Sequence, residues 1–231
     1  MANTILITGT NRGLGLEFTR QYAAAGWRVI ATCRDPDNAH NLKALTNIGN
    51  IEVHALDVTD PTQIQQLAHK FVGQTIDILL NNAGVMDSKG LHFGSLTQEE
   101  WLNNFKVNSI APILMAQAFV DAIARSECKV IANMSSIMGS IGDPAFRRNS
   151  YMYRSSKSAL NAANKSLALE LAALGVICVV IHPGWVKTDM GGPGAILTPQ
   201  QSVAAIRKLL DTVTPALSGH FLAYDGTEVP W

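Results

Sequence analysis

The sequence predicts an α/β fold in which a mainly parallel sheet of seven strands carries helices on both faces. Short apolar runs alternate with amphipathic stretches from one end of the chain to the other, and this alternation is typical of strands that helices cover on both sides. The chain has 231 residues, of which 47% are hydrophobic and 16% are charged, which is enough to bury one large core. We therefore expect residues 1–231 to form a single domain without a separate substrate domain.

Seven apolar runs have the length of strands, and six stretches between or after them have the length of helices. The longest clear apolar run, residues 176–181, is strand-sized and far short of a membrane span. The expected strands are residues 4–8, 28–32, 51–55, 76–81, 129–135, 176–182 and 220–223. The expected helices are residues 14–25, 39–45, 62–71, 97–124, 149–173 and 199–212.

The charge balance and the cysteines limit the possible partners. The chain has 18 Lys and Arg against 18 Asp and Glu, so it lacks the broad positive field that nucleic acid or an anionic membrane usually requires. We expect a small-molecule partner, no nucleic acid and no membrane. Neither the three cysteines nor the histidines have ligand spacing, so no metal is expected. The N-terminus shows no basic leader or cleavage site, so we expect a cytoplasmic protein.

A glycine-rich turn between the first expected strand and the first expected helix predicts a dinucleotide site. Residues 9–15 read Gly-Thr-Asn-Arg-Gly-Leu-Gly, and glycines there allow a tight turn and a close approach of backbone to a pyrophosphate. The helix N-terminus adds unpaired N–H groups and positive potential. No Gly-Lys-Ser or Gly-Lys-Thr follows, so a triphosphate loop is not expected. The alternative is a turn that only joins strand to helix.

The end of the second expected strand favours NADP over NAD. An acidic side chain there would bind the ribose 2'-hydroxyl and repel a 2'-phosphate, but the chain reads Thr32-Cys33-Arg34. Together with Arg12 of the glycine-rich turn, Arg34 offers a second guanidinium group to a 2'-phosphate. In the alternative, Arg34 is a solvated loop residue with Asp35 as its partner. The residues that close the third strand and would lie beside the adenine are Asp57 and Val58.

Tyr153 and Lys157 form a candidate acid–base pair. They are four positions apart in an expected helix and therefore share one face of it. There the ammonium group would lower the pKa of the phenol, so that Tyr153 could give or take a proton near neutral pH. A tyrosine on its own is more often a packing residue, so this assignment depends on the rest of the chain.

In their order and spacing, these motifs resemble the short-chain dehydrogenase/reductase family over nearly the whole chain. The run Asn81-Asn82-Ala83-Gly84 resembles the family's fourth-strand motif, and residues 183–188 resemble the segment that holds the nicotinamide carboxamide. The resemblance implies a Rossmann fold. The catalytic residues that it implies are Asn108, Ser136, Tyr153 and Lys157. The cofactor-binding residues expected from the motifs and the resemblance are Gly9, Asn11, Arg12, Gly13, Leu14, Gly15, Arg34, Asp57, Val58, Asn82, Ala83, Gly84, Tyr153, Lys157, Pro183, Gly184, Val186 and Thr188.

Three longer stretches, residues 133–140, 182–190 and 224–227, resemble the branch of this family that contains the sniffer carbonyl reductases and the bacterial C-factor-like proteins. That branch implies reduction of a carbonyl to an alcohol with NADPH. It leaves open a dinucleotide-binding signalling protein with little turnover. A sugar-nucleotide epimerase or dehydratase is disfavoured by the short chain and by Arg12, which occupies a place where the loop of that relative would have glycine.

The resemblance implies a role for each catalytic residue. Ser136 would hydrogen-bond the substrate carbonyl, Tyr153 would donate the proton, and Lys157 would lower the Tyr153 pKa and bind the nicotinamide ribose. Because Pro112 has no backbone N–H, it can free the carbonyl of Asn108 within the expected helix 97–124, where a water could bind and help to re-protonate Tyr153.

The spacing of the catalytic serine departs from the family pattern. Ser136 precedes Tyr153 by 17 positions, which is more than is common in the family, so the loop between them carries an insertion. Ser140, at the shorter spacing, is the rival. Ser136 suits the role better because it ends the expected fifth strand.

Three less periodic stretches, residues 85–96, 138–149 and 184–198, each follow an expected strand and are the expected walls of the substrate pocket. Their large apolar side chains favour a ketone, aldehyde or quinone of moderate size. These side chains are Met86, Met138, Ile141, Phe146, Trp185 and Met190. Arg147 and Arg148 form a solvated basic loop or recognise an acidic substrate.

The helix that carries Tyr153 has a second, smaller face. It consists of Ala159, Ala163, Ser166 and Glu170. Such a face could pack against the same helix of a second copy, and the family resemblance adds to the expectation of a homodimer or homotetramer.

Overall fold

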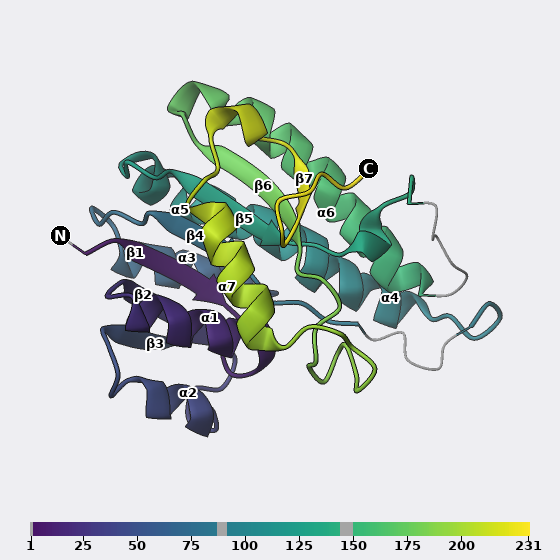
Figure 1. Cartoon of the computed structure of the whole chain (residues 1–231), viewed down its shortest axis with the longest axis horizontal. Helices are drawn as coiled ribbons and strands as arrows, with labels where there is room; N and C mark the ends of the chain where they lie inside the picture. The colour runs from purple at the N-terminus through teal and green to yellow at the C-terminus, as the bar shows by residue number, and fades with distance from the viewer. Residues whose placement is uncertain (1, 87–91, 144–149) are drawn as a thin grey trace.

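The computed structural model describes residues 2–86, 92–143 and 150–231, and it consists of one parallel sheet between two layers of helices (Figure 1). The strands are β1 (Thr4–Thr8), β2 (Arg28–Cys33), β3 (Ile51–Ala55), β4 (Ile78–Asn81), β5 (Val130–Met134), β6 (Ile177–His182) and β7 (Phe221–Ala223). Their order in the sheet is β3-β2-β1-β4-β5-β6-β7, and every pairing between neighbouring strands is parallel. The predicted fold class is confirmed.

The helices divide between the two faces of the sheet. One face is covered by α1 (Gly13–Ala24), α2 (His40–Leu45) and α7 (Pro199–Leu210). The other face carries α3 (Pro61–Lys70), α5 (Ala111–Ala124) and α6 (Tyr151–Glu170), and α4 (Gln98–Phe105) packs beside α6. Short 3₁₀ turns occur at Ile137–Gly139, Ala172–Leu174 and Pro215–Leu217.

Each face of the sheet has its own apolar core. Phe18 of α1 and Ile206 of α7 are fully buried on one face, and Met115 and Phe119 of α5 are buried on the other. Full burial of one such side chain stabilises the fold by ~1.5–3 kcal/mol. Because both faces are covered, the strands are almost entirely apolar, and this is why the sequence identified them.

The strand order fixes where a ligand can bind. From β1 the chain moves outward through β2 to β3 and then returns to β4 on the other side of β1. The loops after β1 and β4 therefore diverge, and this point of reversal at the carboxyl edge is where open α/β sheets bind dinucleotides. The loops after β5 and β6 open onto the same edge.

The predicted helix 97–124 is not a continuous α-helix. Between α4 and α5 the segment Lys106–Ile110 is π-helical, and Pro112 lies at the first turn of α5. A proline has no N–H with which to close the α-helical bond four residues back, so the backbone widens just before it. Asn108 lies at the centre of this π-helical segment.

The residues Gln98–Ala124 are together long and apolar enough to span a membrane by length and composition. More than half of its most apolar window of 18 residues is buried inside the protein, and the stretch packs against α3, α6 and the sheet. A core helix of a soluble protein meets the same criteria.

Candidate active site

Three glycines shape a cradle after β1. Gly9 has a φ of +71° and Gly13 a φ of +56°, a region that favours glycine. A Cβ at Gly9 would lie 2.9 Å from the Cα of Ala83, and a Cβ at Gly15 would collide with the carbonyl oxygen of Gly9. Here the backbone of the turn, the start of α1 and the loop after β4 approach more closely than side chains would allow.

Hydrogen bonds from the loop after β4 hold this cradle. Thr8 Oγ1 accepts from the backbone N–H groups of Asn82 and Ala83, at 3.0 Å each. Asn82 Nδ2 donates to the carbonyl oxygens of Thr8 at 2.8 Å and Gly9 at 3.1 Å. Gly84 follows, and a Cβ there would lie 3.4 Å from Asn108 Oδ1 and 3.7 Å from Lys157 Nζ. The loop after β4 thus connects the glycine cradle with the predicted catalytic residues.

The N-terminus of α1 fits a pyrophosphate. Arg12 is its N-cap residue, makes no side-chain capping bond, and no acidic residue lies in the first turn. The first N–H groups of a helix have no acceptors inside it and attract anions. Leu14 is half-buried in this turn and Asn11 is exposed at its rim. The predicted cofactor residues of the turn therefore surround the first N–H groups of α1.

At the end of β2, the structure tests the two interpretations of Arg34. Asp35 accepts hydrogen bonds from the backbone and the side chain of Asn38, at 3.2 and 2.6 Å, and these bonds hold its pKa below the usual range. Asp35 is thus bonded to Asn38, and the ion pairs of the described residues do not join it to Arg34. Arg34 itself is exposed, which agrees with a solvated loop residue. Thr32 is fully buried and donates to the carbonyl of Ile7, so β2 ends with a neutral residue followed by an exposed guanidinium.

Beyond β3, Asp57 and Val58 turn the chain toward α3. Asp57 Oδ1 accepts from Thr59 N at 2.8 Å and from Thr59 Oγ1 at 2.7 Å, while Asp57 N donates to Gln63 Oε1 at 2.8 Å. Val58 is buried. These bonds fix the loop, and the predicted contact with adenine stays a prediction.

Ser136 and Tyr153 meet where β5 ends. Ser136 follows β5, and its Oγ accepts from Met138 N at 3.2 Å. Tyr153 lies in the first turn of α6, is only 6% exposed, and its hydroxyl is close enough to Ser136 for that serine to influence its pKa. Burial raises the pKa of Tyr153, and the nearby Ser136 side chain opposes this rise. At neutral pH the hydroxyl therefore carries its proton.

Lys157 lies one turn further along α6 and is also buried. Its Nζ donates to the carbonyl of Met134 at 2.7 Å and lies 5.9 Å from the centre of the Tyr153 ring. Desolvation lowers the pKa of Lys157 to about 7. The prediction that Lys157 lowers the Tyr153 pKa is wrong for the chain by itself, because burial disfavours the charged form of both groups.

Asn108 joins the π-helical segment to α6. Its Nδ2 donates to Ser156 Oγ at 3.0 Å and to the Val85 carbonyl at 2.9 Å, and its Oδ1 accepts from Val85 N at 3.0 Å. Asn108 is fully buried next to the residue that precedes Lys157. The side chain thus fixes α6 and the loop after β4, and a water on its carbonyl stays a prediction.

The segment after β6 closes on itself. Gly184 has a φ of +80°, and a Cβ there would lie 2.5 Å from the Leu197 side chain. Lys187 N donates to the Leu197 carbonyl at 2.8 Å, and Thr188 N donates to the Val186 carbonyl at 2.8 Å. Pro183 is anchored through its carbonyl, which accepts from Ser202 Oγ at 2.6 Å. Residues 183–188 therefore form a fixed backbone edge opposite the glycine cradle; a Cβ at Gly13 would lie 3.6 Å from the Thr188 side chain.

Comparison with known proteins agrees with this geometry. The short chain dehydrogenase family matches residues 3–194. The chain belongs to this family. The structure of this short-chain dehydrogenase is similar to that of the carbonyl reductase Sniffer of D. melanogaster, with a TM-score of 0.93 and 35% identity over 100% of both chains. It is also similar to the NADPH-bound carbonyl reductase from chicken fatty liver, with a TM-score of 0.92 and 33% identity over 100% of this chain and 99% of that one.

One sequence relative of this short-chain dehydrogenase is named for signalling rather than for an enzymatic reaction. The C-signal protein of Myxococcus xanthus is 37% identical over 158 residues, which cover 68% of this chain and 93% of that protein. The predicted resemblance to the sniffer and C-factor-like branch is confirmed.

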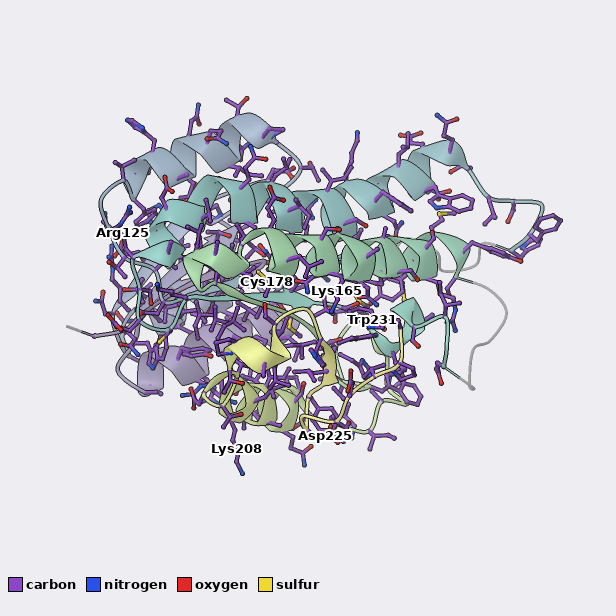
Figure 2. All side chains as sticks on the ribbon, turned by 90° about the horizontal axis from the view of Figure 1, so that it is seen from above. Arg125, Lys165, Cys178, Lys208, Asp225 and Trp231 are labelled. Atoms are coloured by element: carbon purple, nitrogen blue, oxygen red, sulfur yellow. The ribbon has the colours of Figure 1, made fainter. Side chains whose placement is uncertain are left out.

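Ser140, the rival serine, has a structural role in this short-chain dehydrogenase. It is fully buried, and its Oγ donates to the carbonyl of Trp231 at 3.3 Å. The same carbonyl accepts from Ile141 N at 3.0 Å and Gly142 N at 2.6 Å. Trp231 lies at the end of the chain beyond β7 (Figure 2), with its ring 5.8 Å from that of Phe221. Ser140 therefore ties the loop after β5 to the C-terminal segment, and Ser136 stays the predicted catalytic serine.

A buried ladder of three asparagines escaped the sequence analysis of this short-chain dehydrogenase. Asn81 Nδ2 of β4 donates to Asn133 Oδ1 of β5 at 2.8 Å, and Asn133 Nδ2 donates to Asn164 Oδ1 of α6 at 2.8 Å. The side chains are 0–3% exposed. The available signal was the presence of an amide side chain in strands that are otherwise apolar. Buried polar groups need partners, so such an amide indicates another polar side chain nearby. The ladder sets α6, and with it Tyr153, on the sheet.

The predicted pocket walls are partly apolar and partly outside the described residues. Ile141, Trp185 and Met190 are 74%, 53% and 39% exposed, respectively. Phe146, Arg147 and Arg148 lie outside the described residues. The sequence analysis missed Phe93 and Tyr151, whose rings are 6.4 Å apart on neighbouring segments at the same edge. Among the described residues, no group of three or more His, Cys, Asp or Glu side chains could hold a metal ion.

Proposed function

We propose that this protein is an NADPH-dependent carbonyl reductase that converts a ketone, aldehyde or quinone to an alcohol, with Tyr153 as the proton donor. The observation that carries this proposal is the position of Ser136 beside a buried Tyr153 whose pKa is raised by burial. Together they offer two O–H groups to a single carbonyl oxygen, at the sheet edge that also holds the glycine cradle.

The residues divide the chemistry as follows. The glycine cradle and residues 183–188 would hold a reduced nicotinamide cofactor, and the chemistry it would supply when bound is hydride transfer to the carbonyl carbon. Ser136 Oγ–H holds the carbonyl oxygen and stabilises the negative charge that develops on it. Tyr153 Oη–H then gives its proton to that oxygen, which completes the alcohol and leaves a phenolate. Lys157, with a pKa of about 7, takes up a proton at Nζ near neutral pH and stabilises the phenolate.

The cofactor assignment rests on charge at the adenosine end. β2 ends without an acidic side chain, Arg34 directly after it is exposed, and Arg12 of the glycine-rich turn is exposed as well. Guanidinium groups bind phosphate bidentately, while an acid at this position would select the 2'-hydroxyl of NAD. The chicken carbonyl reductase, similar over the whole chain, is NADPH-bound, which supports NADP(H) rather than NAD(H).

A signalling protein with little turnover is the second candidate, because the C-signal of Myxococcus xanthus is similar to this chain. A protein that only binds a dinucleotide has no need of a proton donor and a buried amine at the carbonyl position. The arrangement of Ser136, Tyr153 and Lys157 therefore favours the enzyme. We further propose a cytoplasmic homodimer or homotetramer, with Ala159, Ala163, Ser166 and Glu170 on the contact face.

The experiment combines purified protein, NADPH and a panel of ketones, aldehydes and quinones, and follows the loss of nicotinamide absorbance. We expect consumption with the wild type, and a rate about 10²–10⁴-fold lower with Tyr153→Phe, since general acid catalysis contributes about that much. Tyr22→Phe is the matched control, because Tyr22 is a buried tyrosine of α1 in the core on the other face of the sheet. Equal rates for the wild type and Tyr153→Phe, or no consumption by the wild type, would count against the enzyme.

A further inference from the structure

An ion pair joins the glycine cradle to the segment after β6 that lies opposite it, and we call the space between them the cofactor groove. Arg12 Nη1 donates to Asp189 Oδ2 at 2.7 Å, across 177 positions of sequence. Arg12 caps the N-terminus of α1, and Asp189 follows Thr188 in the segment between β6 and α7. The two side chains are 69% and 78% exposed. The pair therefore lies at the surface, where water and salt weaken it.

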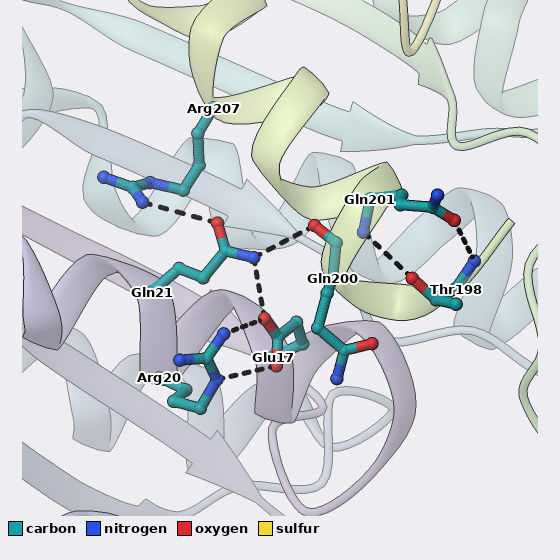
Figure 3. Close-up of polar contacts among 7 residues, drawn as sticks. All are labelled: Glu17, Arg20, Gln21, Thr198, Gln200, Gln201 and Arg207. Carbon is teal, nitrogen blue, oxygen red and sulfur yellow. Dashed lines mark hydrogen bonds and ion pairs between the residues drawn. The ribbon is translucent and has the colours of Figure 1, made fainter.

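The backbone on both sides of this pair is anchored elsewhere. At the start of α7, Thr198 and Gln201 form a reciprocal capping box (Figure 3). Figure 3 also shows Gln21 of α1 at the centre of a network: its Nε2 donates to Glu17 Oε1 at 2.7 Å and to the Gln200 carbonyl at 3.1 Å. Because α1 and the start of α7 are fixed to each other in this way, a rotation of the Arg12 side chain does not require either element to move.

The structure gives Arg12 room for that rotation. Arg12, Lys187 and Asp189 line a cavity of about 460 Å³ beside α1. Two more charges in its lining, Glu17 and Arg20, pair with each other, with Arg20 Nε donating to Glu17 Oε2 at 2.9 Å. Arg12 can therefore leave Asp189 without displacing packed side chains.

We propose that Asp189 is a cofactor-specificity residue that competes with the 2'-phosphate of NADPH for Arg12. This proposal rests on the proposed function, in which Arg12 is one of two guanidinium groups for that phosphate. A phosphate group offers more charge and more acceptor oxygens than one carboxylate, so it displaces Asp189. Because NADPH must break the ion pair between Arg12 and Asp189 in order to bind, its affinity is lower by the free energy of that pair. NADH has no 2'-phosphate, leaves the pair intact, and its affinity does not depend on Asp189.

The size of the effect follows from the exposure of the pair. An exposed ion pair contributes up to about 1 kcal/mol, which corresponds to about a five-fold change in affinity. Asp189→Asn should therefore tighten NADPH binding about two- to five-fold at low ionic strength and leave NADH binding unchanged. Added salt should reduce the difference.

The experiment measures dissociation constants for NADPH and NADH, without substrate, from nicotinamide fluorescence. The proteins are the wild type, Asp189→Asn, Arg12→Gln and the double variant, with Glu228→Gln as a control for the loss of one exposed carboxylate far from the groove. Thermal denaturation of each protein without cofactor checks that it is folded. We expect Asp189→Asn to tighten NADPH binding only where Arg12 is present, and Glu228→Gln to have no effect.

Other outcomes overturn the proposal. Equal tightening in the Arg12→Gln background would mean that Asp189 acts only through long-range repulsion. Weaker binding by Asp189→Asn would mean that Asp189 orients Arg12 for the phosphate. If Asp189→Asn binds NADPH as tightly as the wild type does, and the wild type prefers NADPH to NADH, the competition by Asp189 is refuted while the proposed cofactor preference stands. A wild type that binds NADPH and NADH equally would refute the proposed cofactor preference and this proposal with it.

Discussion

Replacing Asn133 by leucine tests whether the buried amide ladder holds α6 on the sheet. In Asn133→Leu, Asn81 Nδ2 keeps the carbonyl of Pro112 at 3.2 Å, but Asn164 Oδ1 loses its donor. A buried unsatisfied group costs ~1–3 kcal/mol, and each lost hydrogen bond about 0.5–1.5 kcal/mol. With one orphaned oxygen and two lost bonds, we expect the free energy of unfolding to fall by roughly 2–6 kcal/mol, a large part of the ~5–15 kcal/mol of a typical domain.

The double variant Asn133→Leu, Asn164→Leu separates hydrogen bonding from packing. It removes the orphaned oxygen. The carbonyl of Cys178, which accepts from Asn164 Nδ2 at 3.4 Å, keeps the N–H of Gly219 at 2.7 Å. Replacing both partners of a buried hydrogen bond by apolar groups costs far less than replacing one. We expect the loss in the double variant to be smaller than the sum of the two single losses by about 1.5 kcal/mol or more.

Urea denaturation followed by tryptophan fluorescence gives these free energies. Asn41→Leu is the control, because Asn41 is exposed on α2 and a surface substitution should change stability by less than about 0.5 kcal/mol. If the double variant loses as much as the two single variants together, the amides do not act as a connected ladder and the reasoning fails.

Three further predictions concern titration and close packing. Burial lowers the pKa of Lys157 to about 7 from 10.5, so between these values the unfolded chain binds a proton that the folded chain does not. Stability should therefore rise with pH over that range, and urea denaturation of Lys157→Met should show a flatter profile; a parallel profile would contradict this. Burial lowers the pKa of His182 to about 4 from 6.5, so stability should fall as pH drops through that interval, and His182→Gln should remove this loss in the same assay. In Gly15→Ala the new methyl group meets the carbonyl of Gly9, so we expect a loss of ~1–3 kcal/mol and weaker NADPH binding by fluorescence titration. Gly73→Ala, where the positive φ alone strains the new side chain in open space, is the control for a loss of stability away from the cradle and should leave NADPH binding unchanged. Unchanged NADPH binding in Gly15→Ala would show that the cradle is not tight.

The sequence predicted the sheet because both of its faces are buried, which makes every strand a short apolar run. It placed strand ends less well. The predicted strand 129–135 begins at Val130 in the structure, since Lys129 has a φ of +53° and cannot continue a ladder. It also predicted one helix over 97–124, where Pro112 in fact forces a π-helical segment. Proline was visible in the sequence, but the widened turn before it depends on how the backbone relaxes.

The site shows a similar division. Tyr153 and Lys157 could be paired from spacing alone, because four positions on a helix fix their neighbourhood. Partners on distant segments could not. The amide of Asn133 in an apolar strand signals a buried polar partner but does not say that this partner is Asn164, and the ion pair of Arg12 with Asp189 has no local sequence signal. The sequence also could not predict the direction in which the Tyr153 pKa is shifted. This direction depends on how deeply the hydroxyl is buried, which spacing does not report.

Burial acts in opposite directions on the two members of the Tyr153–Lys157 pair. It favours the neutral form of each, and so raises the pKa of the phenol and lowers that of the ammonium group. Once Tyr153 has given up its proton, a phenolate faces Lys157, whose Nζ is 5.9 Å from the ring centre. At that distance, with an effective dielectric constant of ~20, opposite charges attract by about 3 kcal/mol, or about two pKa units. Proton loss at Tyr153 therefore drives proton uptake at Lys157, and the pKa values belong to the pair rather than to either residue. If Lys157 is treated as permanently charged, the expected shift of the Tyr153 pKa has the wrong direction before the reaction. After proton transfer, when Lys157 is charged beside the phenolate, the expected direction is right.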